Sequence, residues 1–429
     1  MAISAVASEL PRSLSADDFI PFDAKQAALG QLLFYDKILS GNRNISCGTC
    51  HHHDHGGADG LSLGIGEGGV GVGPRRVNGV GDDAITKRIP RNAPAFWNLG
   101  AKEIRVLFHD GRLSKSDLYD NGFNSPAEEW LPKGLTNLLS AQALLPLTAQ
   151  FEMAGNPKEN EIAGAVHDRI DKAWPIIAKR IRTIPEYAEG FIEAFENIQN
   201  PAEVTIVEIA EALAAFIGTE WQSIDAPFDA YIAGNKTALS LEQERGLMLF
   251  YGKAQCSTCH SGALLTDQKF HAIALPPFGP GRTRLFDPYA RDVGHMGESD
   301  DVDDAYRFRT PSLRNVELTA PYGHNGAYPN LEGIVRHHME PQKSFDLWKR
   351  DWANLPSIEP LKKADFMIMN DQREMARVRA KVDIDIPVLD ETEIGDLVSF
   401  LQALTGENAR SNTLPLGRPS KVPSGFSVD

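Results

Sequence analysis

Apolar side chains recur every three or four positions through much of this chain, which is the spacing of amphipathic helices. One such segment runs from Pro21 to Leu39 and ends at Ser40-Gly41, and a second runs from Ser240 to Tyr251. A third, from Glu159 to Gly218, keeps helical spacing over most of its length. These patterns predict a mainly α-helical protein in which the periodic apolar residues form the core.

Two of the helical segments share a sequence pattern. Residues 29–35 (LGQLLFY) are similar to residues 245–251 (RGLMLFY), and each segment leads into a motif with two cysteines. We therefore interpret the chain as two similar units, residues 1–200 and 201–429, which meet at Asn200-Pro201. Residues 410–429, with three prolines, predict a polar tail that packs over the surface or frays.

Both units contain the sequence Cys-x-x-Cys-His, and the two copies use all four cysteines of the chain. This spacing is the signature of c-type haem attachment, because both thiols can bond to one porphyrin while the imidazole reaches the iron. A chance pair, a redox or zinc pair, or two disulfides are the alternatives. The histidine after each pair favours two covalently bound haems c. The motif residues are Cys47, Cys50 and His51 in the first unit and Cys256, Cys259 and His260 in the second.

Composition and charge exclude some classes of protein. A chain of 429 residues is long enough for two or three domains, and its net charge of −15 argues against nucleic-acid binding. No run of about 18 apolar residues occurs, so we expect no membrane span. Because haem c is attached outside the bacterial cytoplasm, we expect a periplasmic protein. Residues 1–7 are too short for a signal peptide, so a leader is expected to have been removed.

Several further segments resemble the di-haem bacterial cytochrome c peroxidase and MauG superfamily, over nearly the whole chain. They are Arg91–Pro94, Phe108–Arg112, Gln142–Met153, Phe308–Asn315 and Leu318–Gly326. The resemblance implies two cytochrome-c-like haem domains that face each other across an interface. It also implies that peroxide reacts at the N-terminal haem and that electrons pass through the C-terminal haem.

The resemblance gives catalytic roles to residues of the first unit. Glu152 is expected to move a proton between the two peroxide oxygens, while Gln142 and Pro146 shape the pocket. The alternative for Glu152 is a solvated loop carboxylate. Many peroxidase relatives hold a blocking histidine in the Gly-rich loop, here residues 56–81. The matching position is Glu67, so we expect a five-coordinate first iron that is open to peroxide.

Three more histidines, His52, His53 and His55, follow the first motif. Directly after His51 they are poorly placed to reach the opposite face of the same iron. We interpret them as solvated or propionate-contacting residues, with adventitious metal binding as the alternative.

The second iron needs a sixth ligand from the predicted helix Leu331–Met339. In relatives this ligand is a methionine or a tyrosine, and the count from His324 reaches His338, with Met339 as the alternative. Neighbouring residues on a helix point about 100° apart, so only one of them can face the iron. Ligation by His338 predicts a lower potential than ligation by Met339.

Relatives also place a tryptophan between the haems, immediately before Asp-Gly-Arg. This chain has His109 there, and an imidazole is harder to oxidise than an indole. Trp97 is a candidate substitute, with a place in the core as its alternative. Arg309 and Arg314 are candidates for pairing with haem propionates or for a structural ion pair. The extra sequence Leu113–Ser140 receives no assignment.

The resemblance further implies a calcium ion between the domains, held by the Asn92 side chain and the backbone carbonyls of Thr319 and Pro321. Oxygen ligands of this kind suit calcium; the alternative is that Asn92 caps a turn.

Together these assignments predict a periplasmic di-haem c peroxidase. It would reduce hydrogen peroxide with electrons from a small soluble donor such as a cytochrome c or a cupredoxin, and a homodimer is one option for its assembly. One alternative is a MauG-like enzyme that uses high-valent haem to oxidise residues of a partner protein. The other is a non-catalytic di-haem electron-transfer cytochrome.

Overall fold

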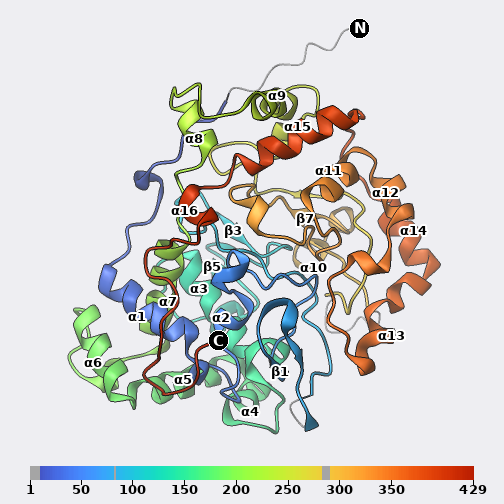
Figure 1. Ribbon diagram of the computed structural model, residues 1–429. Coiled ribbons are helices and arrows are strands. Elements are labelled where there is room, and N and C mark those ends of the chain that lie inside the picture. The colour runs from blue at the N-terminus through green and yellow to red at the C-terminus, as the bar shows by residue number, and fades with distance from the viewer. Residues whose placement is uncertain (1–9, 82–83, 283–289) are drawn as a thin grey trace.

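The computed structural model describes residues 10–81, 84–282 and 290–429, and it confirms a mainly helical protein (Figure 1). The α-helices are α1 (Ala24–Tyr35), α2 (Cys47–Cys50), α3 (Leu138–Ala143), α4 (Glu161–Asp168), α5 (Ala173–Arg182), α6 (Pro185–Ala194), α7 (Ile206–Glu220), α8 (Pro227–Ile232), α9 (Leu241–Tyr251), α10 (Met296–Ser299), α11 (Leu331–Met339), α12 (Pro341–Leu347), α13 (Lys362–Asp365), α14 (Gln372–Ala380), α15 (Glu391–Gln402) and α16 (Glu407–Arg410).

The strands are short and form three small antiparallel sheets. They are β1 (Gly69–Val70) with β2 (Val77–Asn78), β3 (Val106–Leu107) with β4 (Leu113–Lys115) and β5 (Phe123–Asn124), and β6 (Phe270–His271) with β7 (Phe308–Arg309).

The first hydrophobic core is built where α1 crosses α7. Asp23 caps α1 by accepting hydrogen bonds from two backbone N–H groups of its first turn, which fixes where the helix begins. At the crossing, a Cβ added to Gly30 would lie 1.9 Å from the carbonyl oxygen of Ala212, so the two backbones touch. Phe34 and Phe216 pack beside this contact in the core.

The second core repeats this arrangement with α9 and α15. Ser240 caps α9, and a Cβ added to Gly246 would lie 2.0 Å from the carbonyl oxygen of Asp396. Phe250 and Phe400 pack beside this contact, as the two phenylalanines do in the first core. The two similar sequence segments therefore form matching helices, each crossing a partner helix at its glycine.

The chain does not divide simply in space at residue 200. Helix α7 follows that position, yet it packs with α1, α3 and α5 in the first core. The C-terminal tail also returns to this core, because Gln31 Nε2 donates to the carbonyl oxygens of Leu416 and Gly417 at 2.8 and 2.9 Å. Figure 1 shows this red tail running past α7 and α1. The boundary at residue 200 stays a prediction.

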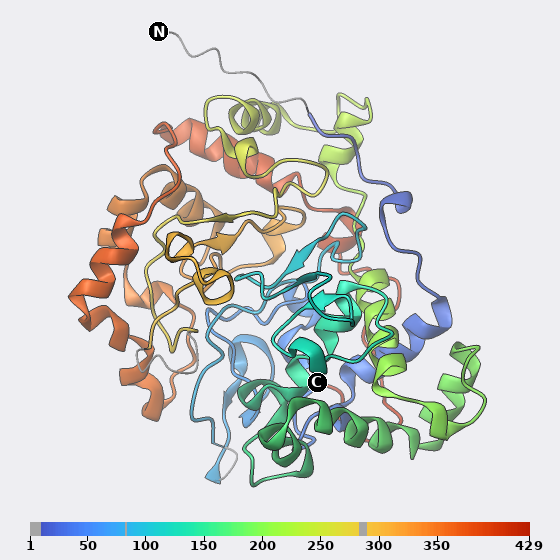
Figure 2. The same cartoon turned by 180° about the vertical axis from the view of Figure 1, so that it is seen from behind.

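Seen from behind, the orange segments gather on one side of the molecule and the blue and green segments on the other (Figure 2). Within the described part of the chain, no helix combines the length and the apolar character needed to cross a membrane.

Candidate haem-binding sites

A cavity of about 510 Å³ lies beside the second motif. Cys256, Cys259 and His260 line it, as do His338 and Met339 from α11. This volume lies in the range of pockets that hold cofactors and other small ligands. The lining therefore brings the attachment cysteines together with every residue that we expected to ligate the second iron.

The imidazoles of His260 and His338 are both oriented for metal binding. The Nδ1–H of His260 donates to the carbonyl oxygen of Leu265 at 3.1 Å, and that of His338 donates to the carbonyl oxygen of Ile334 at 2.8 Å. Each ring is thus fixed through its Nδ1–H, and its Nε2 is left to bind a metal ion. Burial lowers the pKa of both, that of His260 to about 4, which favours the neutral form that binds iron.

His337, on the other side of His338, is committed to protein contacts. Its Nδ1 accepts a hydrogen bond from the Tyr328 hydroxyl at 2.8 Å, and its Nε2–H donates to the carbonyl oxygen of Ile273 at 2.6 Å. With both ring nitrogens engaged, His337 has none left for a metal. The two residues of α11 that line the cavity as candidate ligands are therefore His338 and its neighbour Met339.

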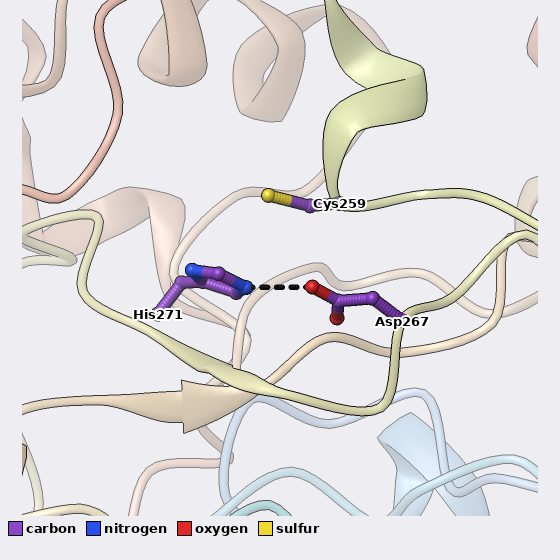
Figure 3. A group of neighbouring side chains, drawn as sticks. All are labelled: Cys259, Asp267 and His271. Carbon is purple, nitrogen blue, oxygen red and sulfur yellow. Dashed lines mark hydrogen bonds and ion pairs between the residues drawn. The ribbon is translucent and has the colours of Figure 1, made fainter. Parts of the chain in front are cut away.

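Cys259, Asp267 and His271 bring their ligand atoms within 4.8 Å of one another beside this cavity (Figure 3). The Nε2–H of His271 donates to Asp267 Oδ2 at 2.9 Å. Once the Cys259 sulfur bonds to a porphyrin, it ceases to be a thiolate ligand. The group therefore fits a histidine–carboxylate pair beside the haem better than a separate metal site.

The first motif holds His51 in the same way. Its Nδ1–H donates to the carbonyl oxygen of Gly57 at 2.9 Å, and the Phe96 ring stacks on the imidazole with centroids 4.1 Å apart. Burial lowers the pKa of His51 to about 4. A fixed, neutral imidazole with Nε2 left over, next to Cys47 and Cys50, fits a haem c here as well.

Glu152 lies on a π-helical turn, η8 (Gln150–Ala154), packed against the Gly-rich loop of the first motif. The backbone N–H of Glu67 donates to the carbonyl oxygens of Phe151 and Glu152, at 3.2 and 3.0 Å. Burial raises the pKa of Glu152, while the positive charges of Arg112 and Arg282 oppose this rise. A buried carboxyl group whose pKa is raised can both accept and return a proton.

The other predicted residues of this pocket lie on the segment that leads to η8. Gln142 is on α3, and Pro146 begins the short 3-10 helix η7 (Pro146–Thr148). The Glu67 carboxylate accepts hydrogen bonds from Asn42 Nδ2 at 2.9 Å and Asn44 Nδ2 at 2.7 Å. Its side chain is therefore fastened to the protein at the position of the blocking ligand.

The two bridge candidates, His109 and Trp97, both line the cavity of the second motif. The Nε2–H of His109 donates to the carbonyl oxygen of Asn92 at 3.1 Å, and burial lowers its pKa to about 4. Trp97 reaches toward the first motif, because its Nε1 lies 3.3 Å from the Cβ that would be added at Gly56. This buried N–H has no hydrogen-bond partner among the described residues.

The two candidate arginines differ in their partners. Arg309 Nε donates to the carbonyl oxygen of Phe108 at 3.0 Å, and no carboxylate of the described residues pairs with it. Burial lowers its pKa to about 10. Arg314 already forms a buried ion pair with Asp229, at 2.6 Å, although its Nη2 has no described partner. Arg309 is partly buried, lines the cavity and pairs with no described carboxylate, so it fits a propionate better than Arg314 does.

Asn92, Thr319 and Pro321 line the same cavity. Asn92 Nδ2 donates to the carbonyl oxygen of Leu61 at 2.7 Å, which leaves its Oδ1 for another partner. The calcium site expected at these residues stays a prediction.

Sequence reasoning missed a hydrogen-bonded group beside the first motif. The Tyr35 hydroxyl donates to His53 Nδ1, and His53 Nε2–H donates to Glu220 Oε1 at 2.7 Å. His52 and His53 are buried, so the solvated alternative is wrong for these two, while the propionate-contacting alternative stays a prediction. The position of Tyr35 in the repeated segment was a signal, but nothing in the sequence linked it to Glu220.

Comparison with known proteins places these sites in a family. The family model described as di-haem cytochrome c peroxidase matches residues 24–237. The methylamine utilization protein MauG of Methylorubrum extorquens is 28% identical over 343 residues, covering 79% of this chain and 76% of the relative. The cytochrome-c peroxidase IdrP1 of Denitromonas iodatirespirans is 30% identical over 345 residues, covering 76% and 74%.

A solved structure is similar over almost the whole length. The crystal structure of a MauG-like protein associated with microbial copper homeostasis superimposes with a TM-score of 0.58 at 26% identity, covering 95% of both chains. Since the fold, the doubled haem motif and these relatives agree, the chain belongs to the di-haem cytochrome c peroxidase family of oxidoreductases.

Proposed function

We propose that this protein is a di-haem c peroxidase that reduces hydrogen peroxide at its N-terminal haem. Residues 1–200 and 201–429 are the proposed haem domains, and electrons arrive through the C-terminal one. The observation that carries the proposal is Glu152, whose buried carboxyl group has a raised pKa and whose backbone is hydrogen-bonded to Glu67 in the loop of the first motif.

In the N-terminal site, Cys47 and Cys50 are proposed to hold the haem and His51 to ligate its iron. The bound haem supplies the electrons that cleave the oxygen–oxygen bond. Glu152 would accept a proton from one peroxide oxygen and return it to the other, which leaves as water. Gln142 and Pro146 are proposed to shape the space in which peroxide binds.

The first iron is proposed to be open to peroxide without prior reduction of the second. The Glu67 carboxylate, at the position of the blocking ligand, is engaged by Asn42 and Asn44. A side chain held by two amide groups would have to give up both hydrogen bonds to approach an iron.

In the C-terminal site, Cys256, Cys259 and His260 are proposed to hold the second haem. We favour His338 as the sixth ligand because its Nδ1 is fixed and its Nε2 is left over, and we keep Met339 as the alternative.

Two further groups are proposed to bind near this haem. Arg309 would pair with a propionate, since a guanidinium suits a carboxylate, whereas Arg314 would act mainly through its pair with Asp229. A calcium ion would be bound by Asn92, Thr319 and Pro321.

Electron transfer between the haems is proposed to use Trp97 as well as His109. Both side chains line the cavity of the second motif, and only an indole is readily oxidised. Trp97 also approaches Gly56 in the loop that follows His51. It is therefore the better bridge of the two.

The electron donor is proposed to be a small periplasmic protein with a basic surface, such as a cytochrome c or a cupredoxin. The net charge of −15 favours an oppositely charged partner. A homodimer is one option for the assembly of the protein, and analytical ultracentrifugation tests it.

A MauG-like oxidation of a partner protein is the second candidate, favoured by the engaged Glu67 and by a second iron ligand other than methionine. Peroxide-dependent oxidation of reduced cytochrome c distinguishes the two. Sustained turnover supports the peroxidase. Little turnover together with a long-lived oxidised state supports the partner-oxidising enzyme, and a failure of peroxide to react would contradict both.

A further inference from the structure

An unbroken series of aromatic rings leads away from the proximal side of the first haem site. Phe96 stacks on His51, with ring centroids 4.1 Å apart, and Trp221 lies 5.3 Å from Phe96. The His53 ring lies 5.1 Å from Trp221, and Tyr35 lies 5.7 Å from His53. Each ring is in contact with the next, so an electron can cross this core in short steps.

The series ends at Tyr35, whose hydroxyl group donates a hydrogen bond to His53. His53 Nε2–H donates to Glu220 Oε1 at 2.7 Å, which leaves His53 Nδ1 to accept the hydrogen bond from the Tyr35 hydroxyl. Glu220 is fixed in turn, since it accepts the backbone N–H groups of Leu416 and Gly417 at 2.8 and 2.7 Å. All three side chains are buried in the first core.

The Tyr35 ring also touches the haem motif itself. A Cβ added to Gly48, in α2, would lie 2.3 Å from the Tyr35 ring. Burial raises the pKa of Tyr35, so its phenol keeps its proton in the resting protein. Removal of an electron from this tyrosine therefore requires a place for the proton, and the existing hydrogen bond offers one.

The second unit provides an internal comparison. Tyr251 ends the matching segment before the second motif, but its buried hydroxyl has no partner among the described residues. Ser261-Gly262 follow His260, where His52-His53 follow His51. The tyrosine–histidine–glutamate group is thus built only beside the haem at which we propose that peroxide reacts.

We propose that Tyr35 is a redox-active residue that takes up an oxidising equivalent produced at the N-terminal haem by hydrogen peroxide. The inference rests on the proposed function. One electron leaves Tyr35 and reaches the haem site through the ring series, so the tyrosine is oxidised and the haem site is reduced by one electron. The Tyr35 O–H bond breaks, its proton moves to His53 Nδ1, and a neutral tyrosyl radical remains. One electron from the donor protein and the same proton restore the phenol.

The test is freeze-quench EPR of the haem-loaded protein after addition of one equivalent of hydrogen peroxide, with the optical spectrum followed in parallel. We expect an organic radical signal in the wild type, and we expect it to narrow when the protein contains ring-deuterated tyrosine. The signal should be lost in Tyr35→Phe and kept in the matched control Tyr251→Phe. Haem content and circular dichroism verify that both variants fold.

The outcomes separate the inference from the proposed function. An optical change with no radical, a radical that ring deuteration leaves unchanged, or a radical that persists in Tyr35→Phe would overturn the role of Tyr35 and leave the peroxidase intact. If Tyr35→Phe does not fold, the deuteration result and loss of the signal in Glu220→Gln decide the matter. The absence of any optical change would overturn the proposed function and the inference with it.

Discussion

At the scale of single residues, the environment of a side chain decides its chemistry. Glu152 is an ordinary glutamate in the sequence, yet burial raises its pKa and the Glu67 backbone holds its turn in place. His337 and His338 are neighbours, yet hydrogen bonds occupy both nitrogens of the first and only Nδ1 of the second.

Replacement of Glu152 by Gln removes the proposed proton carrier while keeping the size of the side chain. We expect the reaction with peroxide to slow by about 10²- to 10⁴-fold, the usual contribution of general acid–base catalysis. Stopped-flow mixing with peroxide measures the rate. The exposed Glu129→Gln serves as the control and should react like the wild type; equal rates in all three proteins would remove Glu152 from the mechanism.

The raised pKa of Glu152 predicts the pH dependence of the same rate. Only the carboxylate can accept a proton, so the rate should fall as the pH decreases through a pKa above the ordinary glutamate value. The rate constant measured across the acidic range should follow this curve in the wild type and lose it in Glu152→Gln. If Glu152→Gln leaves the pH dependence of the rate unaltered, a group other than Glu152 is responsible for it.

Replacement of His338 by Met tests the second iron ligand. A methionine ligand raises the potential of a haem relative to bis-histidine ligation, within the roughly 0.8 V that axial ligands span. Potentiometric titration should therefore show a higher potential for the C-terminal haem in His338→Met and little change in Met339→Leu. The reverse result would identify Met339 as the ligand.

How well each site could be predicted from the sequence depends on how far apart its residues lie along the chain. Cys47 to His51 is a local pattern, so the motif alone indicates a haem. The count from His324 to His338 covers one short segment. Both His338 and the alternative Met339 line the cavity, so the choice of ligand stays a prediction. Tyr35, His53 and Glu220 lie far apart in sequence, and no spacing rule joins them.

At the scale of helices, both units pack one helix closely against a partner helix at a glycine. Helices α1 and α9 each carry a glycine that faces the backbone of a partner helix, at Gly30 and Gly246. The sequence revealed the pair of helices through their similarity. It did not reveal the partners, because α7 and α15 have no comparable motif and packing alone brings them together.

Replacement of Gly30 by Ala should force α1 away from α7, since the new methyl group would overlap the Ala212 carbonyl. Overpacking of this kind costs about 1–3 kcal/mol, more than alanine gains in helix propensity. Denaturant unfolding of the haem-loaded protein measures the loss. Gly395→Ala, on α15 with no atom within 4 Å of the added Cβ, is the matched control and should be neutral or stabilising. Equal stability of both variants would contradict the close crossing.

At the scale of the whole molecule, the chain crosses between its two cores more often than its sequence indicates. The repeated segments and motifs predicted two units, but α7 and the tail join the first core from beyond the predicted boundary. Long-range packing of this kind leaves no local pattern in a sequence. His109 and Trp97, the bridge candidates of the sequence, both line the cavity of the second motif.

Replacement of Trp97 by Phe tests that bridge. An oxidisable indole would be lost between the motifs, so electron transfer from the C-terminal to the N-terminal haem should slow severalfold. Flash reduction followed by optical detection measures the transfer rate. Trp174→Phe, in the first core, is the control and should leave the rate unchanged; an unchanged rate in Trp97→Phe would favour direct transfer past His109.

The central claim is that the first haem reacts directly with hydrogen peroxide. The most direct test adds one equivalent of peroxide to the fully oxidised di-haem protein and follows the optical spectrum in a stopped-flow instrument. We predict a rapid change in the haem spectrum without prior reduction, followed by a return to the starting spectrum when reduced donor is added. A spectrum that changes only after the C-terminal haem is reduced, or not at all, would contradict the account.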